Sequence, residues 1–266
     1  MSITVETDAF FPGIHRELGL FQEHEPAWTA LNNLKEFIRD TISPNLPDTI
    51  LIGVPLDRHM AMIQGQWADH GFDVVCSPET KGRFLVRRGG ELVPDAILIC
   101  AGAVFASIDV ELAQGVTIEP GALVKGPAII GEFSEVRQGA YLRGDCLVGA
   151  RCVVGHTTEV KHSVFLDGAK AGHFAYVGDS ILGRDVNMGA GTKLANLKFG
   201  PGNVFITVNG ERIDTRRRKI GAIFGDRVQT GCNSVTNPGS VIGPGSLIAP
   251  NTTVAPGVYA ARSIIR

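Results

Sequence analysis

Three side chains in the middle of the 266-residue chain are of types that could act on an anionic substrate. Arg143 and Lys161 are cations, and His173 can take up a proton near neutral pH. Two cations that face the same way repel each other unless an anion lies against them, so the pair favours an anion-binding site. The residue types alone leave the plainer interpretations open, namely two solvated cations and a structural histidine.

The element that must position these side chains is a six-residue repeat. Mostly aliphatic residues recur at every sixth position from Ile118 to Leu166, again from Leu182 to Leu194, and after a gap from Phe224 onward. The residue four positions further on is small or of modest size in almost every repeat. A period of six fits neither an α-helix nor an alternating strand, and it predicts an all-β solenoid in which three hexads make one coil.

The repeat determines which side chains become neighbours. With three hexads in a coil, residues 18 positions apart lie directly above one another at a spacing of about 4.8 Å. Arg143 and Lys161 are 18 positions apart and are therefore expected to stack on one face. The hexad register changes between residues 171 and 179, in the segment that contains His173. We expect this break to aim His173 toward a ligand.

Residues 1–105 do not follow the six-residue period and are predicted to form a small α/β cap of unknown role. The cap would contain an amphipathic helix over 27–42, buried strands over 49–54 and 96–100, and a hairpin over 83–93. The β-helix would occupy residues 106–266. The gap in its repeat, about 197–218, is predicted to be a two-stranded hairpin insertion, because alternating apolar residues lead up to Asn209 and Gly210.

Composition narrows the classes of partner. The net charge is −2, so no general attraction to nucleic acid or to an anionic membrane is expected. Five scattered cysteines without a Cys-x-x-Cys pair favour reduced thiols and a cytoplasmic location. The first eleven residues carry acids and no long apolar run, which argues against a signal peptide, and no apolar stretch reaches the length of a membrane span.

Several motifs resemble one family of enzymes. The segments 159–161, 171–179 and 186–192, followed by Asn196, are similar to the acetyltransferase half of bifunctional N-acetylglucosamine-1-phosphate uridyltransferase/glucosamine-1-phosphate acetyltransferase. The insertion, with residues 208–211 and 216–223, resembles the archaeal sugar-1-phosphate nucleotidylyltransferase/acetyltransferase branch more than the bacterial one. The resemblance covers about 118–258 and implies a left-handed β-helix, acetyl-CoA as co-substrate, and N-acetylation of an amino-sugar phosphate.

The resemblance also implies a role for individual residues. His173 would be the general base, and the backbone N–H of Ala190 would face the oxyanion. The remaining substrate-binding positions implied by the resemblance are Arg143, Lys161 and Lys219 for the phosphate, and Tyr176, Asn187 and Asn196 for orienting the sugar and the base. The cofactor contacts would be Ala190, Cys232 and Ala249, with no metal required.

The chain departs from the family in ways that affect these expectations. Cys232 stands where the family has a serine, and Pro250 stands where another cofactor contact would be expected. Residues 1–105 lack the glycine-rich phosphate loop of the nucleotidyltransferase half, so no nucleotidyl transfer is expected. The family also implies a homotrimer with active sites between subunits.

Two other functions stay open on the sequence. One is a metal enzyme of the γ-carbonic anhydrase type, which would use His156, His162 and His173. The other is a non-catalytic sugar-phosphate-binding or scaffold protein that kept the fold. The sequence leaves undecided the epimer of the amino sugar, whether a phosphate or a nucleotide is attached at C1, and the length of the acyl chain.

Overall fold

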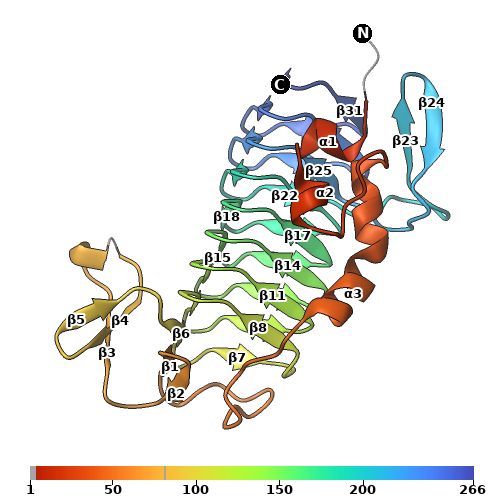
Figure 1. The fold of residues 1–266 in the computed structure, drawn as a ribbon. Coiled ribbons are helices and arrows are strands. Elements are labelled where there is room, and N and C mark those ends of the chain that lie inside the picture. The colour runs from red at the N-terminus through yellow and green to blue at the C-terminus, as the bar shows by residue number, and fades with distance from the viewer. Residues whose placement is uncertain (1–3, 81) are drawn as a thin grey trace.

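A left-handed parallel β-helix forms most of the computed structural model, which describes residues 4–80 and 82–266 (Figure 1). Each coil contributes one strand to each of three parallel sheets, as the hexad repeat predicted. Sheet 1 contains β6 (Ile97–Ile99), β9 (Thr117–Ile118), β12 (Glu135–Val136), β15 (Val153–His156), β18 (Lys170–His173), β21 (Asn187–Met188), β26 (Gln229–Thr230), β29 (Leu247–Ile248) and β32 (Ile264–Ile265). Sheet 2 contains β7 (Val104–Phe105), β10 (Leu123–Lys125), β13 (Tyr141–Arg143), β16 (Glu159–Lys161), β19 (Tyr176–Gly178), β22 (Lys193–Leu194), β27 (Val235–Thr236) and β30 (Thr253–Val254). Sheet 3 contains β8 (Val110–Leu112), β11 (Ala128–Ile130), β14 (Cys146–Val148), β17 (Ser163–Phe165), β20 (Ile181–Leu182), β25 (Ala222–Phe224), β28 (Ser240–Ile242) and β31 (Gly257–Tyr259).

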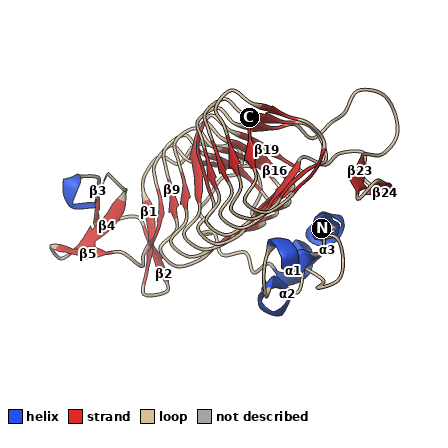
Figure 2. Cartoon of the chain, turned by 90° about the horizontal axis from the view of Figure 1, so that it is seen from above, coloured by secondary structure: helices blue, strands red, loops and turns tan. Residues whose placement is uncertain are grey.

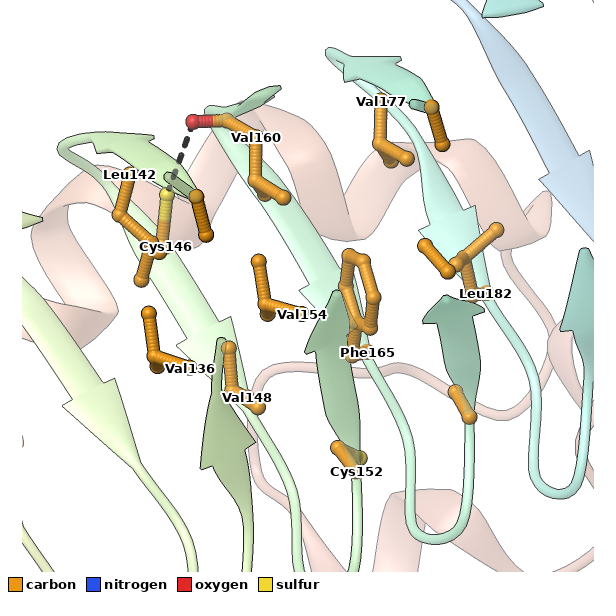
Figure 3. Packing of buried hydrophobic residues seen from close by; sticks show 14 of the residues in the cluster. Val136, Leu142, Cys146, Val148, Cys152, Val154, Val160, Phe165, Val177 and Leu182 are labelled. Atoms are coloured by element: carbon orange, nitrogen blue, oxygen red, sulfur yellow. Dashed lines mark hydrogen bonds between the residues drawn. The ribbon is translucent and has the colours of Figure 1, made fainter. Parts of the chain in front are cut away.

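The interior of the solenoid is filled by one column of apolar side chains for each sheet. Figure 3 shows Val136, Val154 and Leu142 among the inward-facing residues of the central coils. The thiol of Cys146 points to the Val160 carbonyl oxygen at 3.7 Å, and burial raises the pKa of this thiol to about 12. The thiol therefore stays protonated and fills space in the core.

The coil length changes at several places along the repeat, and one of these changes corrects the predicted position of the register break. Leu142 pairs with Val160, 18 residues later, whereas Leu147 pairs with Val164, only 17 residues later. The residue is lost at the corner between sheets 2 and 3, so Phe165 faces the core and Leu166 packs on the outside. The prediction of an inward Leu166 was wrong, and the register shifts at two corners, between Val160 and Phe165 and between Val177 and Leu182, where a single break over 171–179 was predicted. The segment that contains His173 is a regular hexad.

The N-terminal helices cover the outer face of sheet 3. They are α1 (Thr7–Phe10), α2 (Ile14–Glu17), the 3-10 turn η1 (Ala27–Thr29) and α3 (Ala30–Thr41). Leu31, Leu34 and Ile38 line one side of α3 and are fully buried, which confirms the predicted amphipathic helix. They share an apolar cluster with the outward-facing Leu147 and Val164 of sheet 3. This face is apolar because the helices shield it from water.

The N-terminal segment runs along the solenoid in the direction opposite to its coils (Figures 1 and 2). The Phe10 carbonyl accepts the N–H of Asp226 from a late coil at 3.1 Å, and the N–H of Asn45 reaches the Val110 carbonyl of the first coil at 3.2 Å. Residues 4–45 therefore form a strap that contacts both early and late coils.

Short strands follow the strap at the N-terminal end of the solenoid. β1 (Met60–Ile63) and β2 (Gln66–Ala68) extend sheet 1 in antiparallel fashion. A separate three-stranded sheet projects sideways and contains β3 (Asp73–Val75), β4 (Leu85–Arg88) and β5 (Glu91–Val93), with the short turn η2 (Pro78–Thr80). The predicted strand over 49–54 was wrong, because this segment is turned and mostly exposed. The parallel ladder already includes β6, so it begins before the predicted boundary at residue 106.

A two-stranded flap leaves the solenoid between β22 and β25, as predicted. Its strands β23 (Phe205–Val208) and β24 (Glu211–Asp214) turn at Asn209 and Gly210. The flap returns against the strap, where Val204 and Ile206 join the apolar cluster of α3. Among the described residues, no helix is long and apolar enough to span a bilayer.

Candidate acyl-transfer site

A corner between sheets 1 and 2 brings His173, Ala190 and Cys232 into one column. The residue after each of them donates its backbone N–H to the backbone carbonyl of the corner residue one coil earlier. The links are Gly191 to the His173 carbonyl at 3.0 Å and Asn233 to the Ala190 carbonyl at 2.8 Å. Adjacent coils are about 4.8 Å apart. The structure thus places these three predicted site residues in consecutive coils.

The corner position also explains why the Ala190 N–H is free. At this corner, the N–H that links a coil to the one before it belongs to the residue after the corner residue. The N–H of the corner residue itself is therefore not used in the ladder. Pro250, which has no N–H, occupies the corresponding place in a later coil. Within the described residues, the Ala190 N–H has no hydrogen-bond acceptor. It is a fixed donor beside an exposed histidine, the arrangement that oxyanion stabilisation requires.

A groove of about 790 Å³ runs along the outer face of sheet 1 and ends at this corner. His173, Asn187, Ala190 and Cys232 line one end of it. Asn187 is exposed in β21, one strand beyond Lys170 in β18. Four predicted site residues therefore share one solvent-open groove, which could hold two substrates against each other.

The other predicted substrate residues form a polar cluster on sheet 2, around the corner from His173. Arg143 Nη1 lies 2.6 Å from Glu159 Oε1, and Lys161 Nζ lies 3.0 Å from Asp179 Oδ2. Each of these two cations therefore has a carboxylate partner within the chain. Arg143 is 42% exposed and its guanidinium has N–H groups beyond the one that Glu159 accepts, so it can still reach an anion.

Asp179 is the centre of the polar cluster. Its carboxylate is 3% exposed and accepts from Lys161, from the Asn196 amide at 2.6 Å and from Arg217 Nη2 at 3.1 Å. Arg217 also donates to the Leu31 carbonyl of α3 at 2.8 Å. Burial lowers the pKa of Arg217, and the carboxylate of Asp179 opposes that shift. The strap thus contacts the polar cluster through one arginine.

Tyr176 completes the cluster at its corner side. Burial raises the pKa of its hydroxyl, and the carboxylates of Glu159 and Asp179 raise that pKa further. The hydroxyl therefore remains a neutral donor. A Cβ at Gly178 would lie 2.5 Å from the Tyr176 hydroxyl and 2.7 Å from the Asn196 amide, so only glycine allows these two groups to approach each other.

The remaining candidates lie further away. Lys219 is exposed at the base of the flap and pairs with Leu197, which follows Asn196. Ala249 lies one coil beyond Cys232 and outside the groove lining. His162 contacts the Leu31 carbonyl at 2.9 Å, on the opposite side from His156 and His173. Among the described residues of this single chain, the three histidines therefore do not converge on a common point.

Glu159, Asp179 and Arg217 belong to the site although no role was predicted for them from the sequence. Glu159 and Asp179 stand inside the motifs that carried the resemblance, so their acidic character was a visible signal. Arg217 lies in a basic run of the insertion, and nothing in its local sequence marks it as the one that is buried.

Comparison with known proteins supports the resemblance over part of the chain. Residues 124–231 match the family model described as the GMPPB C-terminal domain. A bifunctional sugar-1-phosphate nucleotidylyltransferase/acetyltransferase of Sulfurisphaera tokodaii is 49% identical over 76 residues, which are 29% of this chain and 19% of that protein.

Two proteins named bifunctional protein GlmU extend the comparison. The one from Methanococcus maripaludis strain C7 is 41% identical over 29% of this chain and 18% of its own length. The one from Synechococcus sp. strain CC9311 is 34% identical over 62% of this chain and 34% of its own length. The chain thus spans about a third or less of these relatives. The predicted similarity to bifunctional nucleotidylyltransferase/acetyltransferases, archaeal ones included, is confirmed.

Proposed function

We propose that this chain is an acetyl-CoA-dependent N-acetyltransferase that acts on an amino-sugar phosphate. The observation that carries the proposal is the column in which exposed His173 precedes the free N–H of Ala190 by one coil. The names of the relatives support the reaction class, since each is an acetyltransferase by name or a GlmU protein. A cytosolic location is proposed as well, because all five cysteines are unpaired.

The proposed reaction uses the two faces of the corner. The amine of the sugar attacks the thioester carbonyl, and a C–N bond forms as His173 takes the proton from nitrogen. The negative charge that develops on the carbonyl oxygen is stabilised by the Ala190 N–H. The C–S bond then breaks, and the proton leaves with the thiol of the coenzyme.

The two ends of the site would hold different substrates. Arg143 and Lys161 would bind the sugar phosphate, with Lys219 as a further cation at the flap. Tyr176, Asn187 and Asn196 would orient the sugar. The acyl donor would contact Ala190, Cys232 and Ala249 along the later coils.

The two phosphate cations give a binding prediction. Arg143→Ala and Lys161→Ala are each expected to weaken sugar-phosphate binding by about 1.5–3 kcal/mol, since each removes a charge-assisted hydrogen bond to phosphate. Arg143 should lie at the lower end, because phosphate competes with Glu159 for its guanidinium. Calorimetric titration at low salt measures both effects, which salt screens. Equal affinity of the wild type for the phosphorylated and unphosphorylated amino sugar would contradict this assignment.

A homotrimer is proposed, with active sites between subunits. In its support, the strap covers sheet 3, whereas among the described residues sheet 2 has no such covering element and sheet 1 is covered only at its early coils, by the three-stranded sheet. Multi-angle light scattering at micromolar concentration should give three times the chain mass. A monomer at that concentration would contradict the proposal.

The experiment that tests the function is a substrate panel. Thiol release from acetyl-CoA is measured with glucosamine and galactosamine 1-phosphates and with their nucleotide-linked forms, and pyrophosphate exchange is followed in parallel. Thiol release without pyrophosphate exchange is the expected result, because no glycine-rich phosphate loop was recognised in residues 1–105. Sugar-phosphate binding without thiol release would instead indicate the scaffold or sensor alternative.

A further inference from the structure

The groove on sheet 1 extends beyond the acyl-transfer corner toward the early coils, and that extension is cationic. Arg83, Arg137, Arg151 and Lys170 line it, together with the carboxylate of Glu135. Arg83 comes from the loop before β4, so the three-stranded sheet at the N-terminal end contributes to the groove. None of these five residues has a role in the acyl-transfer chemistry proposed above.

The cations outnumber the carboxylates that face them. Glu135 is 8% exposed, and its two oxygens bind Arg83 Nε and Arg137 Nη2, each at 2.8 Å. One buried carboxylate therefore fixes two guanidiniums and neutralises only one of them. The remaining N–H groups of both arginines are available to an anion. Glu119, one coil before Arg137 in the same column, brings a second carboxylate near the arginines, so Glu135 positions them and the surplus positive charge of the row comes from Lys170.

Lys170 adds an unneutralised charge between these arginines and the corner. Within the described residues, the side chain of Lys170 forms no hydrogen bond or ion pair. It lies two strands from Glu135 on the same face of sheet 1, a distance of about 10 Å, and its strand ends at His173. Arg151, further out, is paired with Asp167 and is 64% exposed. Two guanidiniums and one ammonium thus form a row that leads away from the corner.

We infer that this row is a binding site for the phosphoanhydride of a substrate. A diphosphate carries more negative charge and more acceptor oxygens than a single phosphate, and it can therefore accept charge-assisted hydrogen bonds from several cations of the row. Both a nucleotide-linked amino sugar and the nucleotide part of coenzyme A carry this group. The inference rests on the proposed function for the identity of these two sources.

Binding measurements test the inference independently of turnover. Calorimetry is carried out with uridine diphosphate and with coenzyme A, and with uridine and pantetheine as counterparts that lack the phosphoanhydride. Lys170→Gln and Arg137→Gln should each lower the affinity for the diphosphate-bearing probe about tenfold and leave the affinity for its counterpart unchanged. Arg39→Gln removes the same charge from the exposed side of α3 and serves as the matched control, with unchanged affinities.

The outcomes separate the two sources. Weaker binding of uridine diphosphate alone identifies the acceptor as a nucleotide-linked amino sugar, and weaker binding of coenzyme A alone assigns the row to the acyl donor. Weaker binding of both supports an anion site that recognises the shared group. Affinities for both probes within twofold of the wild type in both folded variants overturn the inference. Absence of thiol release with normal probe binding would overturn the proposed function and leave this site in place.

Discussion

Replacement of His173 by alanine lowers the turnover of amine acetylation by about 10²–10⁴-fold, the usual contribution of a general base. The attacking amine is mostly an ammonium at neutral pH, so transfer needs a group that accepts a proton as the C–N bond forms. The Ala190 N–H and the polar cluster on sheet 2 survive the substitution, because His173 is exposed and lies at a coil corner. The sugar dissociation constant should therefore stay within a few-fold of the wild type.

The neighbouring coil supplies a matched control for His173. His156 occupies the same corner position one coil earlier, and its Nδ1 already contacts the Gln138 carbonyl at 2.9 Å. His156→Ala should keep turnover within a few-fold of the wild type. His173→Gln keeps a polar side chain without the proton-accepting nitrogen and should be nearly as impaired as alanine. Near-normal turnover of a folded His173→Ala protein would show that the histidine is structural.

The second large effect is expected at Asp179. Asp179→Asn removes the only carboxylate among the described residues that both Lys161 and Arg217 contact, at 3.0 and 3.1 Å, and leaves two largely buried cations without compensation. Loss of one partner from a buried ion pair costs about 3–5 kcal/mol of unfolding free energy. Sugar-phosphate affinity should fall as well, because the same carboxylate orients Lys161 and Asn196. Urea denaturation and calorimetry measure the two effects.

A surface pair provides the control for Asp179. Asp57 contacts Arg58 at 3.2 Å, and both side chains are well exposed. Asp57→Asn makes the same chemical change and should leave the unfolding midpoint in urea and sugar-phosphate binding unchanged, since exposed pairs contribute little. An Asp179→Asn protein as stable as Asp57→Asn, with unaltered affinity, would show that the buried cluster neither stabilises the fold nor orders the site.

The architecture was largely readable from the sequence, because a solenoid repeats one local rule. An aliphatic residue every sixth position and the Asn209-Gly210 turn correctly predicted the three sheets and the flap. The phase of the repeat was harder to read. Phe165 and Leu166 are both apolar, and the hydrophobic pattern could not tell which faces the core. The overlooked signal was the residue four positions later, which is the small Ala169 after Phe165 and the charged Lys170 after Leu166. The core accepts a small residue at that position and excludes a charged one, so Phe165 is the residue that faces inward.

The contacts within the site were less accessible to sequence reasoning. The stacking of Arg143 and Lys161 followed from the coil length, and both lie on sheet 2 as expected. The ion pair of Lys161 depends on the shortened corner, where the Asp179 N–H bonds to the Lys161 carbonyl at 2.9 Å. Arg217 reaches this cluster from the insertion, whose residues lie outside the six-residue repeat, so the period could not predict its position. Local spacing therefore predicted which residues stack and missed those that arrive through loops.

The strap has a consequence for the way this chain acquires its structure. Solenoid coils contact mainly their neighbours, so such proteins gain order step by step along the axis. Here Arg217 bonds to Leu31, which lies 186 residues earlier, and Phe10 bonds to the still later Asp226. Contacts between such distant positions raise the contact order and slow folding, since a long loop must close before they form. On the ribosome, the strap emerges first but can dock fully only after the late coils exist. Until then, its apolar side chains and the bare face of sheet 3 are both exposed, and this interval is when the chain is most open to chaperone capture and to aggregation.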